Sequence, residues 1–353
     1  MPRAYILTIS EIVKETPSAI TLRFEQPAFG RIWYYPGQFV TLRVDINGVP
    51  CYRSYSISGV PQLDPWLAVT VKRVPGGLVS NYIADHFSPG QKVVVLEPRG
   101  RFYIETGLKN SRHLALFAAG SGITPIMSIL RAILYQEPQS RITLVYANRK
   151  IEEMIFAHTL RELQQRFPDR LRVHYFFSEP GDYPDENDTE GRITDEKVIQ
   201  IMNSAEICDA FYLCGPSGFM DTVARGLNMA GIGPEKIHRE IFTADREEKK
   251  ITQNLGPSYQ VSVSYAGETW QLSVPAGATI LEAALSQHIN LPYSCRRGVC
   301  STCMGMLKSG KVTMDQEDAL LDFERERGCV LVCQAHPDSA DVCIDIGESW
   351  KND

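Results

Sequence analysis

The chain is 353 residues long, with 44% hydrophobic and 22% charged residues and a formal net charge of −6. Single hydrophobic cores stop growing near ~250–300 residues, so we expect two or three domains. No apolar run approaches the ~18 residues of a membrane span, and the first residues lack the apolar core of a secretory signal. We therefore expect a cytoplasmic protein without a membrane span.

The excess negative charge lies at one end of the sequence. Residues 258–353 contain 13 Asp and Glu against 7 Lys and Arg, whereas the preceding residues contain 29 of each kind. This distribution opposes nucleic-acid binding and speeds association with a protein that carries a basic patch, although it also serves solubility alone. We expect a protein partner and no nucleic acid.

Residues 1–107 are predicted to form an antiparallel β-barrel, because short runs of alternating apolar and polar residues are separated by Gly, Pro and Asn turns. Arg53, Tyr55 and Ser56 end one such strand. A guanidinium can fork onto a pyrophosphate, a phenol ring can stack on a flat isoalloxazine, and a hydroxyl can hydrogen-bond to it. A strand of this composition is also common without any ligand.

A candidate phosphate-binding segment follows in the same region, where Pro-Gly-Gly-Leu-Val-Ser precedes a predicted helix. Glycines let backbone amides approach a phosphate, and a helix N-terminus favours an anion. The alternative is an ordinary turn with an N-cap serine. The residues concerned are Gly77, Leu78, Val79 and Ser80.

Residues 110–242 are predicted to form an α/β domain with a parallel sheet, since apolar strands alternate with helical patterns. An acidic, exposed loop is expected at 185–190. The predicted elements in chain order are strand 114–119, helix 125–134, strand 142–146, helix 152–166, strand 171–176, a helix from Asp195 and strand 210–213.

Two turns of this region follow strands, at the edge where parallel sheets bind ligands. Gly120-Ser-Gly-Ile-Thr124-Pro125 follows the first strand, and a proline at the first helical turn is compatible with an N-terminus that receives a phosphate. Cys214-Gly215-Pro216-Ser-Gly-Phe-Met220 follows the last strand. Cys214 is either a structural buried cysteine or a residue that lies against a nicotinamide ring.

The last part of the chain is predicted to be a third domain, at 258–353, after a charged linker that contains Gly and Pro at 243–257. Two strands at 260–265 and 269–274 resemble a hairpin, and a helix at 279–288 follows them.

Four cysteines of this third region have the spacing C-x4-C-x2-C, then 29 residues, then C. This is the spacing of plant-type [2Fe–2S] ferredoxins, in which four thiolates converge on one small cluster. One alternative is structural zinc, which uses C-x2-C pairs, often with histidine, and does not explain the C-x4-C spacing. The other alternative is a chance grouping of reduced cysteines. The predicted ligands are Cys295, Cys300, Cys303 and Cys333.

Five cysteines remain, an odd number that does not suggest a disulfide framework and favours a reducing cytoplasm.

In this order the motifs resemble the ferredoxin–NADP reductase superfamily, with a plant-type [2Fe–2S] ferredoxin domain of the α+β, β-grasp type fused after it. The matching patterns are R-x-Y-S, G-x-G-x-x-P, C-G-P-x-x-F-M and a closing E-x-F at Glu240 to Phe242. The resemblance implies a flavin-binding barrel and an NAD(P)-binding domain. It implies that Ser56 and Cys214 shape the contact at which hydride is transferred, and that the ring of Phe242 lies near the flavin.

The resemblance also bears on the cofactors. It favours FAD, although related fused reductases carry FMN. Arg149 stands where the family meets the adenosine ribose, and a guanidinium there suits a 2′-phosphate and hence NADPH. The alternative is a solvated loop arginine, so NADH stays open.

The whole chain is similar to a class of oxygenase reductases, and within it to the reductase subunits of ring-1,2-phenylacetyl-CoA epoxidases, through residues 72–77, 118–128 and 330–337. This similarity implies electron transfer from NAD(P)H through a flavin and a [2Fe–2S] cluster to an oxygenase. Three alternatives stay open. One is a reductase of another acceptor, such as a ring-hydroxylating dioxygenase, a desaturase or a hybrid-cluster protein. The others are an electron carrier or redox sensor without enzymatic activity, and a zinc-stabilised binding module.

Overall fold

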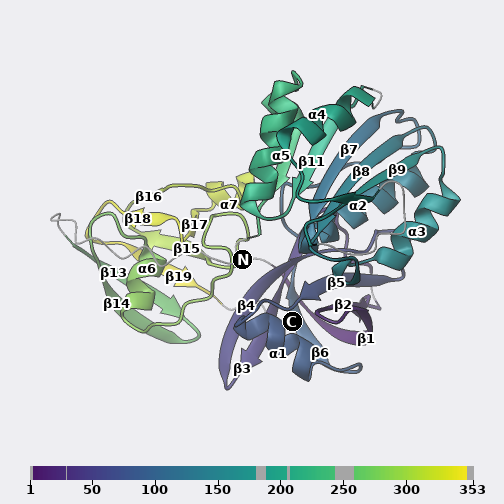
Figure 1. Cartoon of the computed structure of the whole chain (residues 1–353). Helices are drawn as coiled ribbons and strands as arrows, with labels where there is room; N and C mark the ends of the chain where they lie inside the picture. Colours follow the sequence, from purple (N-terminus) through teal and green to yellow (C-terminus); the bar gives the residue numbers. More distant parts are fainter. Residues whose placement is uncertain (1–2, 29, 180–187, 205–206, 243–257, 348–353) are drawn as a thin grey trace.

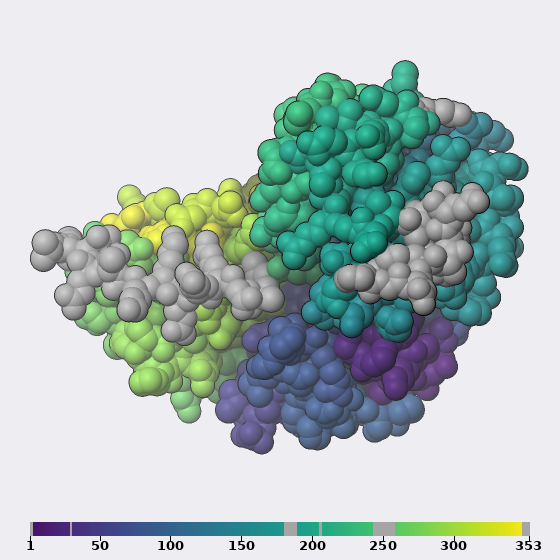
Figure 2. Space-filling view, viewed as in Figure 1, coloured from purple at the N-terminus to yellow at the C-terminus, as the bar shows by residue number. Residues whose placement is uncertain are grey.

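The computed structural model describes residues 3–28, 30–179, 188–204, 207–242 and 258–347. Figure 1 shows three bodies: a purple and blue barrel, a teal α/β domain and a yellow-green domain. The space-filling view shows the yellow-green domain protruding to one side of the other two (Figure 2). The predicted linker and residues 180–187 lie outside the described residues. Among the described residues, no helix is long and apolar enough to cross a membrane.

The first sheet is antiparallel, with strand order β4-β3-β6-β1-β2-β5. A bridge between Ile57 and Val69 joins the end of β4 to β5 and brings the two edges of the sheet together. Alternate residues of these strands fill the core, as the period of two predicts. The elements are β1 (Ala4–Thr16), β2 (Ala19–Glu25), β3 (Phe39–Ile46), β4 (Val49–Ser56), β5 (Trp66–Lys72), α1 (Leu78–His86) and β6 (Lys92–Leu96).

The second sheet is parallel throughout, with strand order β10-β9-β8-β7-β11-β12. The predicted antiparallel barrel and parallel α/β domain are therefore confirmed. The elements are β7 (His113–Ala119), α2 (Ile123–Gln136), β8 (Arg141–Asn148), α3 (Ala157–Arg166), β9 (Leu171–Phe177), β10 (Asp188–Glu190), α4 (Asp195–Ser204), β11 (Ala210–Cys214), α5 (Ser217–Met229) and β12 (Ile237–Glu240).

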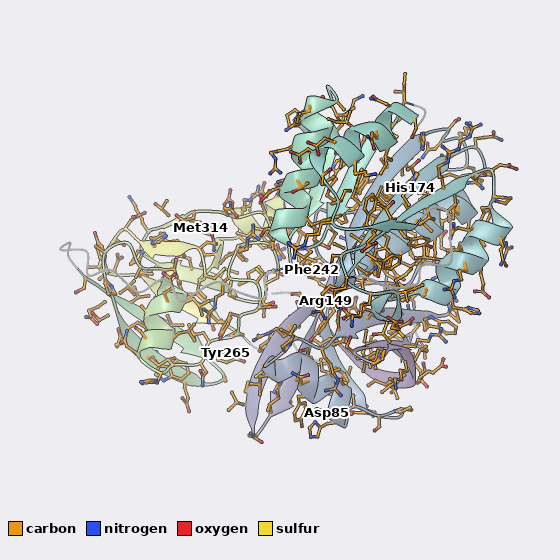
Figure 3. All side chains as sticks on the ribbon, viewed as in Figure 1. Asp85, Arg149, His174, Phe242, Tyr265 and Met314 are labelled. Carbon is orange, nitrogen blue, oxygen red and sulfur yellow. The ribbon has the colours of Figure 1, made fainter. Side chains whose placement is uncertain are left out.

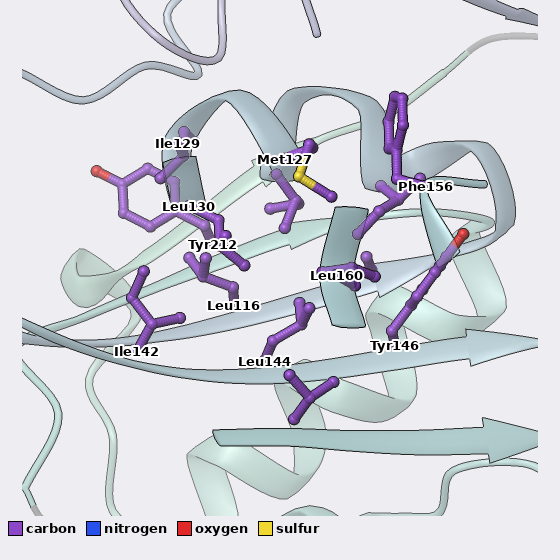
Figure 4. Close-up of a cluster of buried hydrophobic side chains, with 14 of the residues drawn as sticks. Leu116, Met127, Ile129, Leu130, Ile142, Leu144, Tyr146, Phe156, Leu160 and Tyr212 are labelled. Atoms are coloured by element: carbon purple, nitrogen blue, oxygen red, sulfur yellow. The ribbon is translucent and has the colours of Figure 1, made fainter. Parts of the chain in front are cut away.

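Helices cover both faces of this sheet, which explains the continuous apolar run of β7. Leu116 faces the core shared with α2 and α3, and Figure 4 shows it together with Leu144 and Met127. Phe117, the next residue, faces a second core with Val198 of α4 and residues of α5. Each strand position is therefore buried on one side or the other.

Two details of the predicted α/β elements are wrong. The predicted helix 152–166 begins only at Ala157, because Phe156 adopts a left-handed φ of 63° and residues 151–153 form a separate 3₁₀ turn. Part of the predicted acidic loop, Asp188–Glu190, is the edge strand β10, which pairs with β9.

The third domain has a five-stranded sheet of order β14-β13-β19-β15-β17 and a small β16-β18 pair. Helix α6 starts at a capping box, in which the Thr279 hydroxyl accepts from the Glu282 amide. This mixed sheet with a packed helix agrees with the predicted α+β domain. The elements are β13 (Tyr259–Tyr265), β14 (Glu268–Val274), α6 (Ile280–Ser286), β15 (Met304–Ser309), β16 (Val312–Met314), α7 (Asp322–Glu326), β17 (Cys329–Leu331), β18 (Ala335–Pro337) and β19 (Cys343–Ile346).

Candidate active site

The three domains meet around a cavity of about 750 Å³. Its wall combines residues of β4 in the barrel, of β12 in the α/β domain and of the loop that contains Cys295 and Cys300. Phe242 also lines this cavity and lies where the three bodies converge (Figure 3). The volume is in the range of pockets that hold a cofactor. One cavity therefore touches the predicted flavin strand and the predicted cluster loop together.

Ser56, Glu240 and Cys214 gather at one end of this region. Ser56 ends β4, and its hydroxyl donates a hydrogen bond to Glu240 Oε2 at 3.1 Å. Cys214 and Glu240 are register partners at the carboxyl ends of the parallel strands β11 and β12. The structure thus places both predicted catalytic residues beside Glu240, Ser56 through a hydrogen bond and Cys214 through strand pairing.

Glu240 was not among the predicted site residues, although the closing E-x-F pattern contains it. Glu240 as a whole is half-buried, but its carboxyl group is buried. Burial raises the pKa of Glu240 to about 8. The hydrogen bond from Ser56 acts in the opposite direction and offsets part of this increase. Burial, and then the charge of Glu240, raise the pKa of the Cys214 thiol well above its usual value. At neutral pH both groups therefore hold their protons. The available signal was the closing E-x-F pattern, which begins at Glu240.

The other residues of the flavin strand divide between cavity and core. Arg53 lines the cavity and donates to the Tyr52 carbonyl at 2.7 Å. Tyr55 packs against the barrel core, and burial raises the pKa of its phenol.

The segment Gly77 to Ser80 forms the start of α1 and is not among the residues that line the cavity. The Ser80 hydroxyl accepts from the Val74 amide at 3.1 Å, and Asn81 donates to the Gly77 carbonyl. No side chain caps the first amides of α1. Leu78 is exposed and Val79 is buried. The open amides fit the predicted contact with a phosphate.

The two predicted nucleotide turns abut one another. A Cβ on Gly122 would lie 2.1 Å from the Cys214 carbonyl oxygen, so only glycine fits there. A Cβ on Gly215 would lie 2.9 Å from that of Ala119. This packing brings Gly120, Thr124 and Pro125 beside the turn that contains Cys214, Gly215 and Pro216. Met220 is fully buried beneath the sheet and packs in the core.

Arg149 follows β8, and about two-thirds of its side chain is exposed. Its guanidinium pairs with Glu153 at 2.7 Å, and the same carboxylate pairs with Lys72 of the barrel at 3.2 Å. Lys72 Nζ lies 3.9 Å from the place of a Cβ on Gly120. Glu153 thus holds the Arg149 and Lys72 side chains at the edge of the sheet where the nucleotide turns lie.

The cysteine loop is wound tightly around its sulfur atoms. Arg296, Gly298 and Ser301 have left-handed φ values of 52°, 72° and 52°. These turns aim backbone amides at sulfur: the Arg297 amide donates to Cys295 Sγ at 3.3 Å. The Cys295 amide donates to Cys300 Sγ at 3.4 Å. Such hydrogen bonds stabilise thiolates.

The four thiols are arranged as two pairs. The hydrogen bond from Cys300 and then the loop amides lower the pKa of Cys295 to about 6, despite burial. The hydrogen bond from Cys303 lowers the pKa of Cys333 in the same way. Among the described residues, no group of three or more potential ligands surrounds a single ion position. Two pairs of thiols fit two irons with two cysteines each, which is the arrangement of a [2Fe–2S] cluster.

Comparisons with known proteins agree with this division of the chain. Residues 6–104 match the oxidoreductase FAD-binding domain, residues 116–225 the oxidoreductase NAD-binding domain and residues 263–338 the 2Fe-2S iron-sulfur cluster binding domain. The fold is that of phthalate dioxygenase reductase, with a TM-score of 0.58, 24% identity, and coverage of 97% of this chain and 98% of that chain.

Two relatives are similar over nearly their whole length. The ferredoxin reductase component of 3-ketosteroid-9-alpha-monooxygenase from Rhodococcus rhodochrous is 36% identical, covering 95% of each chain. A component of the 1,2-phenylacetyl-CoA epoxidase from Escherichia coli is 35% identical, covering 98% of each chain. The chain is therefore an oxidoreductase with FAD-binding, NAD-binding and [2Fe–2S] domains. It belongs to the family of ferredoxin reductase components of oxygenases.

Proposed function

We propose that this chain takes electrons from NADH or NADPH and passes them, through a flavin and a [2Fe–2S] cluster, to an oxygenase. The single observation that supports this order is the cavity whose wall contains both Ser56 and Cys295. A flavin supplies the change from two-electron to one-electron transfer, and a [2Fe–2S] cluster carries single electrons. FAD is the proposed flavin, in agreement with the matched family. The proposed domain boundaries are 1–107, 110–242 and 258–353, with 243–257 as the linker.

The roles that we propose for the side chains follow from their positions. Arg53 and the segment Gly77 to Ser80, through the uncapped amides at the start of α1, bind flavin phosphates, and Phe242 covers the ring. Gly120, Thr124 and Pro125, with Cys214 to Pro216, form the bed of the nicotinamide nucleotide. Hydride transfer needs only close approach and alignment, so the task of these residues is positioning. Met220 does not contact the nucleotide, and from the core it supports the turn formed by Cys214 to Pro216.

Ser56, Glu240 and Cys214 form the proposed hydride-transfer contact. Glu240 holds a proton at neutral pH, so it adds no charge where hydride arrives. The Ser56 hydroxyl donates a hydrogen bond to Glu240 at 3.1 Å, which orients it. The oriented hydroxyl can exchange a proton with a bound group. Cys214 is fully buried and supports the turn from behind.

We propose an oxygenase as the acceptor, because the relatives named above are components of oxygenase systems. The steroid monooxygenase and epoxidase relatives are almost equally similar, at 36% and 35% identity. Partner choice depends on surface charge and shape, so the proposal stays at the level of an oxygenase and includes the epoxidase.

We also propose a cytoplasmic location. None of the nine cysteines forms a disulfide, which supports a reducing cytoplasm.

The proposal is tested by anaerobic reduction of the holoprotein with NADH and NADPH, and by turnover with cytochrome c as acceptor. Cys300→Ser should abolish cytochrome c reduction and keep bleaching of the flavin by the nucleotide. Cys343→Ser, in β19 of the same domain, is the matched control and should keep both. If Cys300→Ser keeps both activities, the electrons do not pass through the cysteine loop.

A further inference from the structure

The third domain is bound to the barrel by side chains that surround the cavity. The Ser54 amide and hydroxyl both contact Ser294 Oγ, at 3.1 and 3.0 Å, and Ser294 precedes Cys295. The Tyr52 and Tyr265 hydroxyls lie 3.4 Å apart, and Figure 3 shows Tyr265 on the side of its domain that faces the barrel. These contacts set the flavin strand directly against the cysteine loop.

The strongest of these contacts joins Arg99 of the barrel to Glu324 of α7. The guanidinium binds both carboxylate oxygens, with Nη2–Oε1 at 2.7 Å and Nη1–Oε2 at 3.2 Å. Only 9% of the Arg99 side chain and 3% of the Glu324 side chain are exposed. Arg99 also pairs with Glu97, and its backbone bridges Phe39 of β3. A buried, bidentate pair fixes direction as well as distance.

Both ends of this pair are anchored to the electron-transfer region. On the barrel side, Phe39 lines the cavity. On the other side, Arg99 Nη1 reaches the Ala319 carbonyl at 3.5 Å, and the Ala319 amide donates to the Gly298 carbonyl at 2.7 Å. Gly298 lies inside the cysteine loop. The pair thus connects the cavity wall to the cysteine loop through two short links.

We propose that Arg99 is a positioning residue for electron transfer, because its pair with Glu324 holds the cysteine loop against the flavin cavity. This inference rests on the proposed function. Arg101 and Asp318 also join the two domains, at 3.0 Å, but their side chains are at least half exposed and contribute little. Transfer between two fixed centres is sensitive to small displacements, so loss of the buried pair should slow the second electron step and spare the first.

The test uses Arg99→Met and Glu324→Gln in the holoprotein. The glutamine variant keeps an oxygen for the Leu321 amide, which Glu324 accepts at 2.8 Å, so α7 should still form. Arg225→Met is the matched control, since Arg225 and Asp195 form a bidentate pair within one domain. Stopped-flow absorbance after mixing with NADPH, and in parallel with NADH, follows flavin reduction and cluster reduction separately. Hydrogen exchange of the Ser54 amide reports on the contact between the domains.

We expect cluster reduction to slow about tenfold or more in both variants, with flavin reduction near the wild-type rate and faster exchange at Ser54. The control should change neither readout. Cluster reduction at the wild-type rate in Glu324→Gln, or slowed reduction with unchanged exchange at Ser54, would overturn the proposal. If Arg99→Met does not fold, Glu324→Gln alone decides. Failure of both NADH and NADPH to reduce the wild-type cluster would instead contradict the proposed function.

Discussion

The Ser56 hydroxyl reaches across the boundary between two domains and donates to Glu240 Oε2 at 3.1 Å. Ser56 ends a barrel strand, and Glu240 ends a strand of the parallel sheet. Burial raises the pKa of Glu240 to about 8. The hydrogen bond therefore joins the two domains at the point where flavin and nicotinamide should meet, through a group that titrates near physiological pH.

Glu240 should give hydride transfer its pH dependence. Below about pH 8 the carboxyl is protonated and neutral. Above that pH it becomes negative and opposes the arrival of a hydride. We predict that stopped-flow flavin reduction in the wild type slows as pH rises through about 8, and that Glu240→Gln removes this inflection. An unchanged pH profile in the variant would show that another group titrates.

Arg149 should favour NADPH over NADH. The exposed guanidinium already shares Glu153 with Lys72, and a 2′-phosphate would be a stronger acceptor. We predict that Arg149→Ala raises KM for NADPH about tenfold, a change of ~1.4 kcal/mol, and leaves KM for NADH nearly unchanged. Arg141→Ala, at the opposite end of β8, is the control and should affect neither. Equal changes for both nucleotides would exclude a 2′-phosphate contact.

Gly122 should be intolerant of any side chain. Its Cβ would lie 2.1 Å from the Cys214 carbonyl oxygen, so the backbone must shift. We predict that Gly122→Ala lowers the free energy of unfolding by about 1–3 kcal/mol, measured in urea. Gly218→Ala in α5 meets no atom within 4 Å and should instead stabilise the protein by about 0.5–1 kcal/mol. Similar effects of the two substitutions would contradict the packing described here.

The fold was largely predictable because its signals are local. The apolar run of 114–119 is β7, which is buried on both faces. The start of α3 was not predictable, because the left-handed backbone of Phe156 is imposed by tertiary packing and not by local sequence. Phenylalanine rarely adopts a positive φ, so its presence in the sequence does not predict this conformation.

The candidate site was predictable only in part. The spacing of the cysteines and the glycine turns marks each segment, since these residues are required by their own local geometry. Contacts between domains leave no such mark: Arg99 and Glu324 are 225 positions apart, and Ser54 and Ser294 are 240 apart. Glu240 was overlooked because its environment is created by three segments that meet only in the folded chain.

The most direct test is chemical analysis of anaerobically purified protein, followed by titration with NADH or NADPH. We predict about two irons and two acid-labile sulfides per chain, together with FAD, and a decrease in the visible absorbance of both centres on addition of the nucleotide. Protein that carries one zinc and no labile sulfide, or a cluster that the nucleotide leaves oxidised, would contradict electron transfer through the cysteine loop.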